Sequence, residues 1–411
     1  MKYYSGMPHT RKPLVVRESA KPGIYYHYTS LGTLWAVLDS ETLRATQACF
    51  SNDSEEVRKG KNLIKCICER YYQKESSPEN KMLAEYARNL NQDINDEIDC
   101  YIVCFCGDDD KLSQWRAYCR NDGVSIGFAF DGTEPYYYFK DMPEANQPEH
   151  NAVIYPVWYL DESGTIDKEL YHNVVSVDDI SEHILEKINE LRRLADFQME
   201  KASLESTIPL IKHVGFYEED EYRLLVCNTQ SEQGGSIPYP LDPYVKTRED
   251  SGIQNPYINI SFAKKIPESD ADDASKKKAE LISPVKAIRL YNIPENLRLL
   301  IHKRFSALKI IESSIPNDTR SQIVIGAGDE KSQKTMFDSV ERTVTEVCKD
   351  LESERIKIWC EGHLPIRSIR VSPCENQEQV IRSIRHYCKH KKYWLKYVDV
   401  VGSLIPYRRP K

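Results

Sequence analysis

Runs rich in aromatic and β-branched residues alternate along the chain with apolar residues at helical spacing. Runs of the first kind predict strands at 23–30, 42–50, 99–106, 123–130, 152–160, 221–227 and 257–263. Runs of the second kind predict helices after residue 30, from about residue 54, and over 78–92, 111–119 and 177–203. Because strands and helices do not alternate regularly, as they would in a parallel sheet, the pattern predicts an α+β fold with a mixed sheet core and flanking helices.

Two predicted helices begin directly after an extended segment and carry capping residues there. Thr29 or Ser30 can cap the first of them, whose apolar face holds Leu31, Leu34, Trp35 and Leu38. The sequence SNDSEE at 51–56 can cap the second with Asp53 or Ser54. Its acidic residues also favour the positive end of the helix dipole. Polar side chains therefore gather at both helix starts.

Two segments of unusual composition interrupt the pattern. Residues 228–256 contain two adjacent glycines and four prolines, and a connection of this length is typical of a lid over a site. Residues 264–280 are charged and turn-rich, which predicts a domain boundary.

Two later segments resemble each other, because PVKAIRL and PIRSIRV are each followed by a helical stretch that starts at Glu-Asn. This likeness predicts duplicated β-α-β units over about 282–326 and 363–406. We therefore divide the chain into a first domain, an inserted or second α/β region, and a C-terminal β-α-β segment with a basic tail that completes the first domain. These parts are 1–263, 264–362 and 363–411.

Composition and charge exclude several classes of protein. The 411 residues contain 56 Lys plus Arg and 63 Asp plus Glu, a net charge of −7, so the molecule as a whole is not a polycation that binds nucleic acid. Neither of the two glycine-rich phosphate loops, G-x-G-x-x-G and G-x-x-x-x-G-K-[ST], is present. No apolar run is long enough for a membrane span, and the N-terminus lacks a cleavable leader, so we expect a cytoplasmic protein.

The twelve cysteines occur singly or as C-x-C, which favours reduced thiols. Cys100, Cys104 and Cys106 share one face of a predicted strand, where a free cysteine behaves as a small core residue. The alternative is a zinc site together with Cys66 and Cys68, but no paired C-x-x-C or H-x-x-x-H spacing supports it.

Three segments carry candidate functional side chains. His27 and Thr29 lie where a strand meets a helix start, a place suited to a ribose or phosphate oxygen. Asn52 is the polar residue of its segment that capping does not explain. Glu219 and Glu221 belong to four adjacent acids before an apolar strand, and such mutual repulsion needs a reason if the segment is half-buried.

Five motifs in the same order resemble the bacterial domain-of-unknown-function family 2971. They are YHYTSLGTLWAVLDSETLRAT, FSNDSEE, the W-x-x-Y of Trp115 and Tyr118 before GVSIGF, YEEDEYRLLV, and LPIRSIRV with SLIPYR. The resemblance spans about 24–263 and 363–409 and by analogy implies a toxin or phage-defence effector.

A more distant resemblance is to the ADP-ribosyltransferase superfamily, which implies a sheet core of that kind and NAD as substrate. His27 and Thr29 match its His-x-Thr element, Glu219 and Glu221 match its Glu-x-Glu, and Ser125 is the nearest counterpart of its middle element. In this interpretation Glu221 stabilises the cationic ribose, Glu219 orients the acceptor and His27 holds the ribose. Rings that would stack on the bases are those of Tyr28, Trp115 and Tyr118, and Arg44 or Arg223 would meet the pyrophosphate.

Two other functions remain open. In the first, Asp53, Glu219 and Glu221 bind Mg²⁺ for nucleic-acid cleavage. In the second, the protein is a non-catalytic binding module whose acidic turn is solvated surface, so that Glu221 is exposed and distant from His27. Residues 381–411 carry nine Lys plus Arg and one acid, interleaved with aromatic residues, which suggests a nucleic-acid partner or acceptor.

Overall fold

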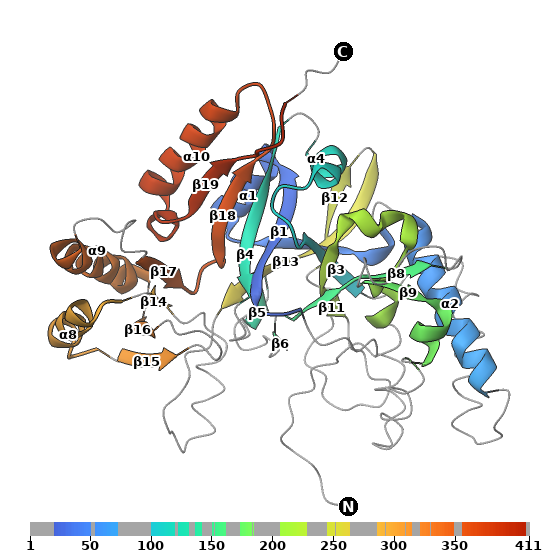
Figure 1. Cartoon of the computed structure of the whole chain (residues 1–411), viewed down its shortest axis with the longest axis horizontal. Helices are drawn as coiled ribbons and strands as arrows, with labels where there is room; N and C mark the ends of the chain where they lie inside the picture. The colour runs from blue at the N-terminus through green and yellow to red at the C-terminus, as the bar shows by residue number, and fades with distance from the viewer. Residues whose placement is uncertain are drawn as a thin grey trace, which may run out of the picture. The chain divides into compact units, whose positions relative to one another are not determined.

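The computed structural model describes residues 20–50, 54–72, 100–119, 122–130, 136–141, 150–151, 153–161, 173–182, 184, 206–227, 245–250, 252–263, 286–291, 293–308, 310–314, 321–328, 330–348 and 356–407. The protein is a mixed α+β protein with a large mixed sheet to which twelve of the described strands belong, flanked by several helices (Figure 1). The chain folds into two compact units, each built from separate stretches of sequence. The first comprises Met1–Tyr25, Leu43–Asp108 and Phe139–Ile260, and the second Tyr26–Thr42, Asp109–Tyr138 and Ser261–Lys411.

The first unit is organised around β11 (Glu221–Cys227), which pairs antiparallel with β3 (Cys100–Cys106) on one side and β7 (Ile154–Pro156) on the other. Further along, β2 (Leu43–Gln47) pairs with β3 and with β13 (Ile253–Ala263). A small parallel sheet is formed by β8 (Trp158–Asp161), β9 (Val174–Ser176) and β10 (Ile211–His213).

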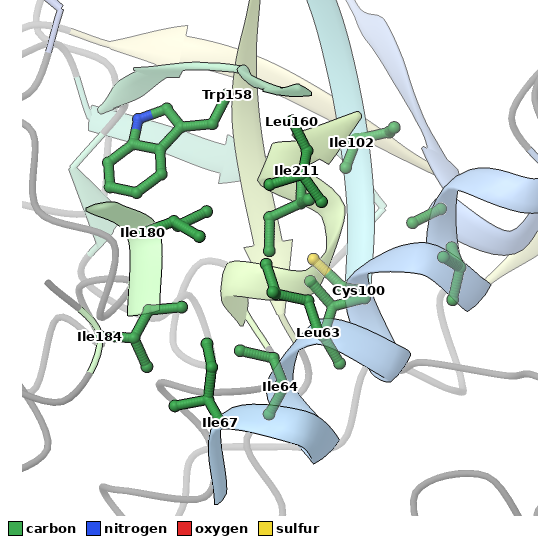
Figure 2. Close-up of a cluster of buried hydrophobic side chains, with 13 residues drawn as sticks. Leu63, Ile64, Ile67, Cys100, Ile102, Trp158, Leu160, Ile180, Ile184 and Ile211 are labelled. Atoms are coloured by element: carbon green, nitrogen blue, oxygen red, sulfur yellow. The ribbon is translucent and has the colours of Figure 1, made fainter. Parts of the chain in front are cut away.

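The core of the first unit lies between these strands and the long helix α2 (Ser54–Tyr72). Leu63, Ile64 and Ile67 of that helix belong to one buried cluster with Cys100 and Ile102 of β3 and with side chains of the small sheet (Figure 2). The apolar positions of α2 recur at helical spacing, which gives the helix one buried face. Cys100 is buried in this cluster and Cys104 packs against it, so these two thiols are core residues as predicted.

The second unit holds two groups of strands. One contains β18 (Ile366–Val371), which pairs antiparallel with β4 (Gly123–Phe130) and parallel with β19 (Asp399–Gly402). The other is a four-stranded antiparallel sheet in the order β15-β16-β14-β17, at Ile310–Ser314, Ser321–Gly328, Lys286–Tyr291 and Lys357–Glu361. The helices of this unit are α1 (Leu31–Ser40), α4 (Leu112–Tyr118), α8 (Glu295–Arg304), α9 (Glu330–Val347) and α10 (Gln377–Lys391).

The structure confirms several predicted elements and corrects others. β1 (Gly23–Ser30) runs directly into α1, and the Ser30 side chain accepts from the N–H of Thr33 as a cap. The strand predicted over 42–50 ends at Gln47, because Ala48–Phe50 form a 3₁₀ turn. The strand predicted over 152–160 is two strands, β7 and β8, which enter different sheets. Pro156, which has no N–H to donate, ends β7.

The predicted lid and the predicted repeat need correction too. Within 228–256, Lys246–Asp250 (β12) forms a hairpin with β13, and Gly252 supplies the positive φ at its turn. β18, α10 and β19 form a β-α-β unit as predicted, but β14 and α8 do not begin one. The strands β16 and β17 that flank β14 are both antiparallel to it. The predicted helix 78–92 and most of 177–203 lie outside the described residues, as do Asn52 and Asp53.

Candidate functional site: a buried carboxylate cluster

Four elements of the first unit bring five charged side chains together. Glu221 and Arg223 lie two positions apart on β11, so they point to the same face of the strand. Glu219 ends the 3₁₀ helix η4 (Val214–Glu219) just before β11. Lys212 comes from β10, and Glu56 from the first turn of α2. We call these five residues the carboxylate cluster.

The turn between η4 and β11 places the two glutamates beside the same lysine. Asp220, between them, adopts a left-handed conformation with φ of 46°, and its N–H donates to the carbonyl of Tyr217. Its carbonyl in turn accepts from the N–H of Gly107. This reversal lets Lys212 Nζ donate to Glu219 Oε2 at 2.6 Å and to Glu221 Oε2 at 3.1 Å.

Arg223 binds two of the three carboxylates of the cluster, those of Glu221 and Glu56. Its Nε and Nη2 donate to the two carboxylate oxygens of Glu221 at 2.8 and 2.9 Å, a bidentate pair. Its Nη1 donates to Glu56 Oε1 and to the carbonyl of Pro209. The second oxygen of Glu56 has no hydrogen-bond partner among the described residues and lies 3.9 Å from Lys212 Nζ.

The cluster is buried, and its charges are not balanced. Arg223 is 1% exposed and Glu221 4%, so the side chains interact at low dielectric. Three carboxylates meet two cations, so full ionisation would leave one negative charge in excess. A buried excess charge is costly, and the cluster can avoid it by holding one proton.

The surroundings shift the pKa values of the three carboxyls in different directions. Burial would raise the pKa of Glu221, but the charges of Arg223 and Lys212 outweigh it and lower that pKa to about 2. Burial raises the pKa of Glu56, and Arg223 only partly offsets the effect. Burial likewise raises the pKa of Glu219 against the charge of Lys212. Within the cluster the pKa of Glu221 is therefore lowered, and those of Glu56 and Glu219 are raised.

Glu219 is the member of the cluster closest to solvent. Its side chain is 15% exposed, whereas those of Glu56, Glu221 and Arg223 are 5% exposed or less. Lys212 Nζ lies 4.9 Å from the ring centre of Phe216, an exposed aromatic residue of η4. Glu219 is therefore the carboxyl of the cluster most accessible to solvent.

The two predicted cations of this unit have different surroundings in the structure. Arg44 is exposed on β2 and its guanidinium lies 4.9 Å from the ring centre of Tyr257. Arg223, the alternative cation for a pyrophosphate, is held inside the cluster by Glu221 and Glu56. The prediction that Glu221 belongs to a solvated surface turn is wrong, because the ion pairs with Lys212 and Arg223 compensate for its burial.

The remaining predicted residues lie in the second unit, on β1, α4 and β4. Tyr28 and Trp115 are buried with their rings edge to face at 4.6 Å, and Trp115 Nε1 donates to Asp110. Tyr118 is half-buried, as are His27 and Thr29. The thiol of Cys119 donates to the carbonyl of Thr29 at 3.4 Å.

Ser125 stands apart from these residues. It is fully buried on β4, and its hydroxyl oxygen has no hydrogen-bond partner among the described residues. Because His27 belongs to the second unit and Glu221 to the first, the predicted roles of these residues in one site stay a prediction.

Sequence reasoning missed Glu56 and Lys212. Glu56 had a sufficient local explanation, since acids are favoured in the first turn of a helix. Lys212 is one cation among 56 and carries no motif. The available signal was Arg223 itself, because a charged residue inside the apolar run of 221–227 needs buried partners.

The described residues also bear on metal binding. They hold no group of three or more His, Cys, Asp or Glu side chains that could bind a metal ion, and ten of their cysteines form no disulfide. Asp53 lies outside the described residues, so the Mg²⁺ nuclease stays a prediction.

The site and fold define an α+β protein with a buried carboxylate cluster, and part of its sequence matches a known family. Residues 114–224 match the model of a family described as protein of unknown function (DUF2971). The matched stretch includes Lys212, Glu219, Glu221 and Arg223, but not Glu56. No match was found among curated proteins or solved structures. None of the described helices has the length and apolar character needed to cross a membrane.

Proposed function

We propose that the protein cleaves the bond between nicotinamide and ribose in NAD and transfers the ADP-ribosyl group to an acceptor or to water. The observation that carries the proposal is the pair Glu219 and Glu221. The two carboxyls share Lys212, yet their surroundings move their pKa values in opposite directions. Two such groups can perform different tasks at one pH, and cleavage of a glycosidic bond needs two tasks.

The reaction assigns one task to each carboxylate. As the C1′–N bond breaks, its electron pair leaves with neutral nicotinamide and positive charge develops on the ribose. Glu221, ionised throughout, stabilises that charge. The acceptor hydroxyl or a water then bonds to C1′, and Glu219 takes the proton that the acceptor loses.

The choice of NAD depends on the resemblance of His27, Thr29, Glu219 and Glu221 to the ADP-ribosyltransferase motifs. The proposal includes a core of that kind, with His27 at the ribose, and by analogy a role as toxin or phage-defence effector. Of the two cations that the resemblance assigns to the pyrophosphate, Arg44 is exposed, whereas Arg223 already binds two carboxylates.

Release of nicotinamide from NAD, measured by chromatography, tests the proposal. We expect Glu219→Gln to lower the rate by roughly 10²- to 10³-fold, the usual effect of removing one such group. This variant leaves Lys212 paired with Glu221, so the fold should survive, which circular dichroism can check. Glu221→Gln should abolish release, but it also disturbs the ion pairs of Arg223.

Glu218→Gln provides the matched control, because Glu218 is an exposed neighbour in the same 3₁₀ helix. Its rate should equal that of the wild type. The proposal fails if the wild type releases no nicotinamide with water, protein or nucleic-acid acceptors. It also fails if folded Glu219→Gln is as fast as the wild type.

A further inference from the structure

The helix α10 of the second unit has one buried face and one cationic face. Ile381, Ile384 and Cys388 are buried against the unit. The exposed side chains of the helix include the basic residues Arg382, Arg385, His386, Lys389, His390 and Lys391, beside Glu378 in the first turn. Their spacing places Arg382, His386 and Lys389 in one stripe along the helix. Figure 1 shows α10 as the long red helix near the C-terminal end of the chain.

Several cations of this face have no counterion among the described residues. Arg382, Lys389 and Lys391 form no ion pair or hydrogen bond there, and the rings of His386 and His390 lie 4.5 Å apart. Arg385, by contrast, donates to the carbonyl of Val400.

The helix dipole accounts for only part of this face. Lys389, His390 and Lys391 lie in the last turn, where positive charge is favoured. Arg382 lies in the middle of the helix and shares the stripe with Lys389, and like charges on one face of a helix repel each other. An external anion that met the whole stripe would relieve this repulsion.

We propose that the exposed face of α10 binds the phosphate backbone of double-stranded nucleic acid. Arg382 and Lys389 are about 10 Å apart along the axis at 1.5 Å per residue. That distance equals about three base-pair steps, because the phosphates of one strand rise by about 3.4 Å each along the duplex axis. The remainder of the chain is acidic enough to give a net charge of −7, so the attraction is local to this face.

Two observations favour this partner over others. A membrane-surface helix needs large apolar side chains beside its cations, whereas Ile381, Ile384 and Cys388 of α10 are buried and Val380 is half-buried. A single strand is held by bases that stack on aromatic rings, and the nearby rings are already engaged within the unit. Tyr387 lies against Trp35 and donates to Asp39, and Trp394 stacks on His363. The binding is therefore to backbone charge and independent of sequence.

This inference does not depend on the proposed NAD chemistry. The test is the fluorescence anisotropy of a labelled 20-base-pair duplex titrated with the full chain in about 25 mM salt. We expect wild-type affinity to fall steeply as salt rises. The triple variant Arg382→Gln, Lys389→Gln, Lys391→Gln should bind about tenfold more weakly or worse. Its salt slope should be lower by up to about 2.7, or about 0.9 for each phosphate that the variant no longer neutralises.

A control variant removes the same charge from other helices of the same unit. Lys303→Gln, Lys331→Gln, Lys334→Gln changes three exposed lysines of α8 and α9 and should bind as the wild type does. The inference is overturned if the wild type does not bind the duplex or if both triple variants weaken equally. It is also overturned if a single strand or anionic lipid vesicles bind more tightly than the duplex. Nicotinamide release by the α10 variant shows separately whether the proposed function holds.

Discussion

Arg223 is a buried side chain that holds the charged groups of the carboxylate cluster in place. It is buried on a central strand, and its guanidinium donates to two carboxylates and one backbone carbonyl. Removing one partner from such a buried group typically costs about 3–5 kcal/mol, because the other charge stays buried and unpaired. The same contacts that stabilise the fold therefore hold Glu221 ionised in a fixed position.

The excess carboxylate in the cluster predicts an unusual dependence of stability on pH. A carboxyl whose folded pKa lies above its unfolded value favours folding while protonated. That contribution is complete below the unfolded pKa and is lost as the pH rises through the folded pKa. Glu56, whose pKa is raised by burial, is such a group. The side chain of the variant Glu56→Gln is neutral at every pH, so the variant lacks this pH-dependent contribution to stability.

We therefore expect the wild type to lose stability relative to Glu56→Gln as the pH rises above about 4.5, the usual pKa of the group. The difference should grow by about 1.4 kcal/mol per pH unit until the folded pKa is passed. Urea unfolding at a series of pH values measures it, with Glu218→Gln as control. Parallel curves for the wild type and Glu56→Gln would show that folding does not raise the pKa of Glu56.

At the scale of elements, the close approach of α2 to the turn at Ile208–Leu210 delivers Glu56 to Arg223. Gly60, one helical turn after Glu56, makes this approach possible. A methyl carbon added there would lie 2.7 Å from the carbonyl oxygen of Ile208 and 2.9 Å from its side chain. Any side chain at position 60 would therefore clash with Ile208.

Gly60→Ala should therefore destabilise the protein by about 1–3 kcal/mol, as overpacking does, despite the better helix propensity of alanine. Gly32→Ala is the matched control, because Gly32 lies in α1 with no neighbour closer than 3.9 Å to the added carbon. It should stabilise the protein by about 0.4–1 kcal/mol. Urea unfolding compares the two, and equal stability of Gly60→Ala and the wild type would contradict the close packing.

Most elements could be predicted because their signals are local. The strands at 23–30, 123–130 and 221–227 have the bounds that the sequence predicts, since aromatic and β-branched residues favour extended backbone wherever they cluster. The hairpin of β12 and β13 was missed because Thr247, Arg248 and Glu249 have no apolar alternation. Their extended conformation comes from pairing with β13.

At the scale of the molecule, the second unit is completed by its last segment. β18 covers the edge of β4, with Ile366 opposite Phe128, although more than 230 residues separate them. His363 Nδ1 forms a hydrogen bond of 2.7 Å with Glu41 Oε2, and this bond ties the same segment to the end of α1. The predicted boundaries at 263 and 362 stay a prediction, but β4 depends on residues beyond both.

Truncation tests this dependence. A chain cut after residue 362 loses β18, α10 and β19, and we expect it to expose β4 and to be degraded by limited proteolysis much faster than the full chain. Coexpression of 363–411 as a separate fragment should restore protection. A chain cut after residue 407 keeps every described strand and should behave as the full chain. A stable, protected 1–362 fragment would show that the first segments fold without the last.

By itself the sequence determined the strands at 23–30, 123–130 and 221–227, where α1 begins, that the acids of 217–222 are unusual beside an apolar strand, and that α10 is basic. These properties depend on residues within a few positions of one another. Only the tertiary structure decided that Glu221 is buried, that Lys212 and Arg223 neutralise it, and that Glu56 is the third carboxylate. Arg223 and Glu56 are 167 positions apart, and their pairing depends on how α2, β10 and β11 pack, which no local pattern encodes.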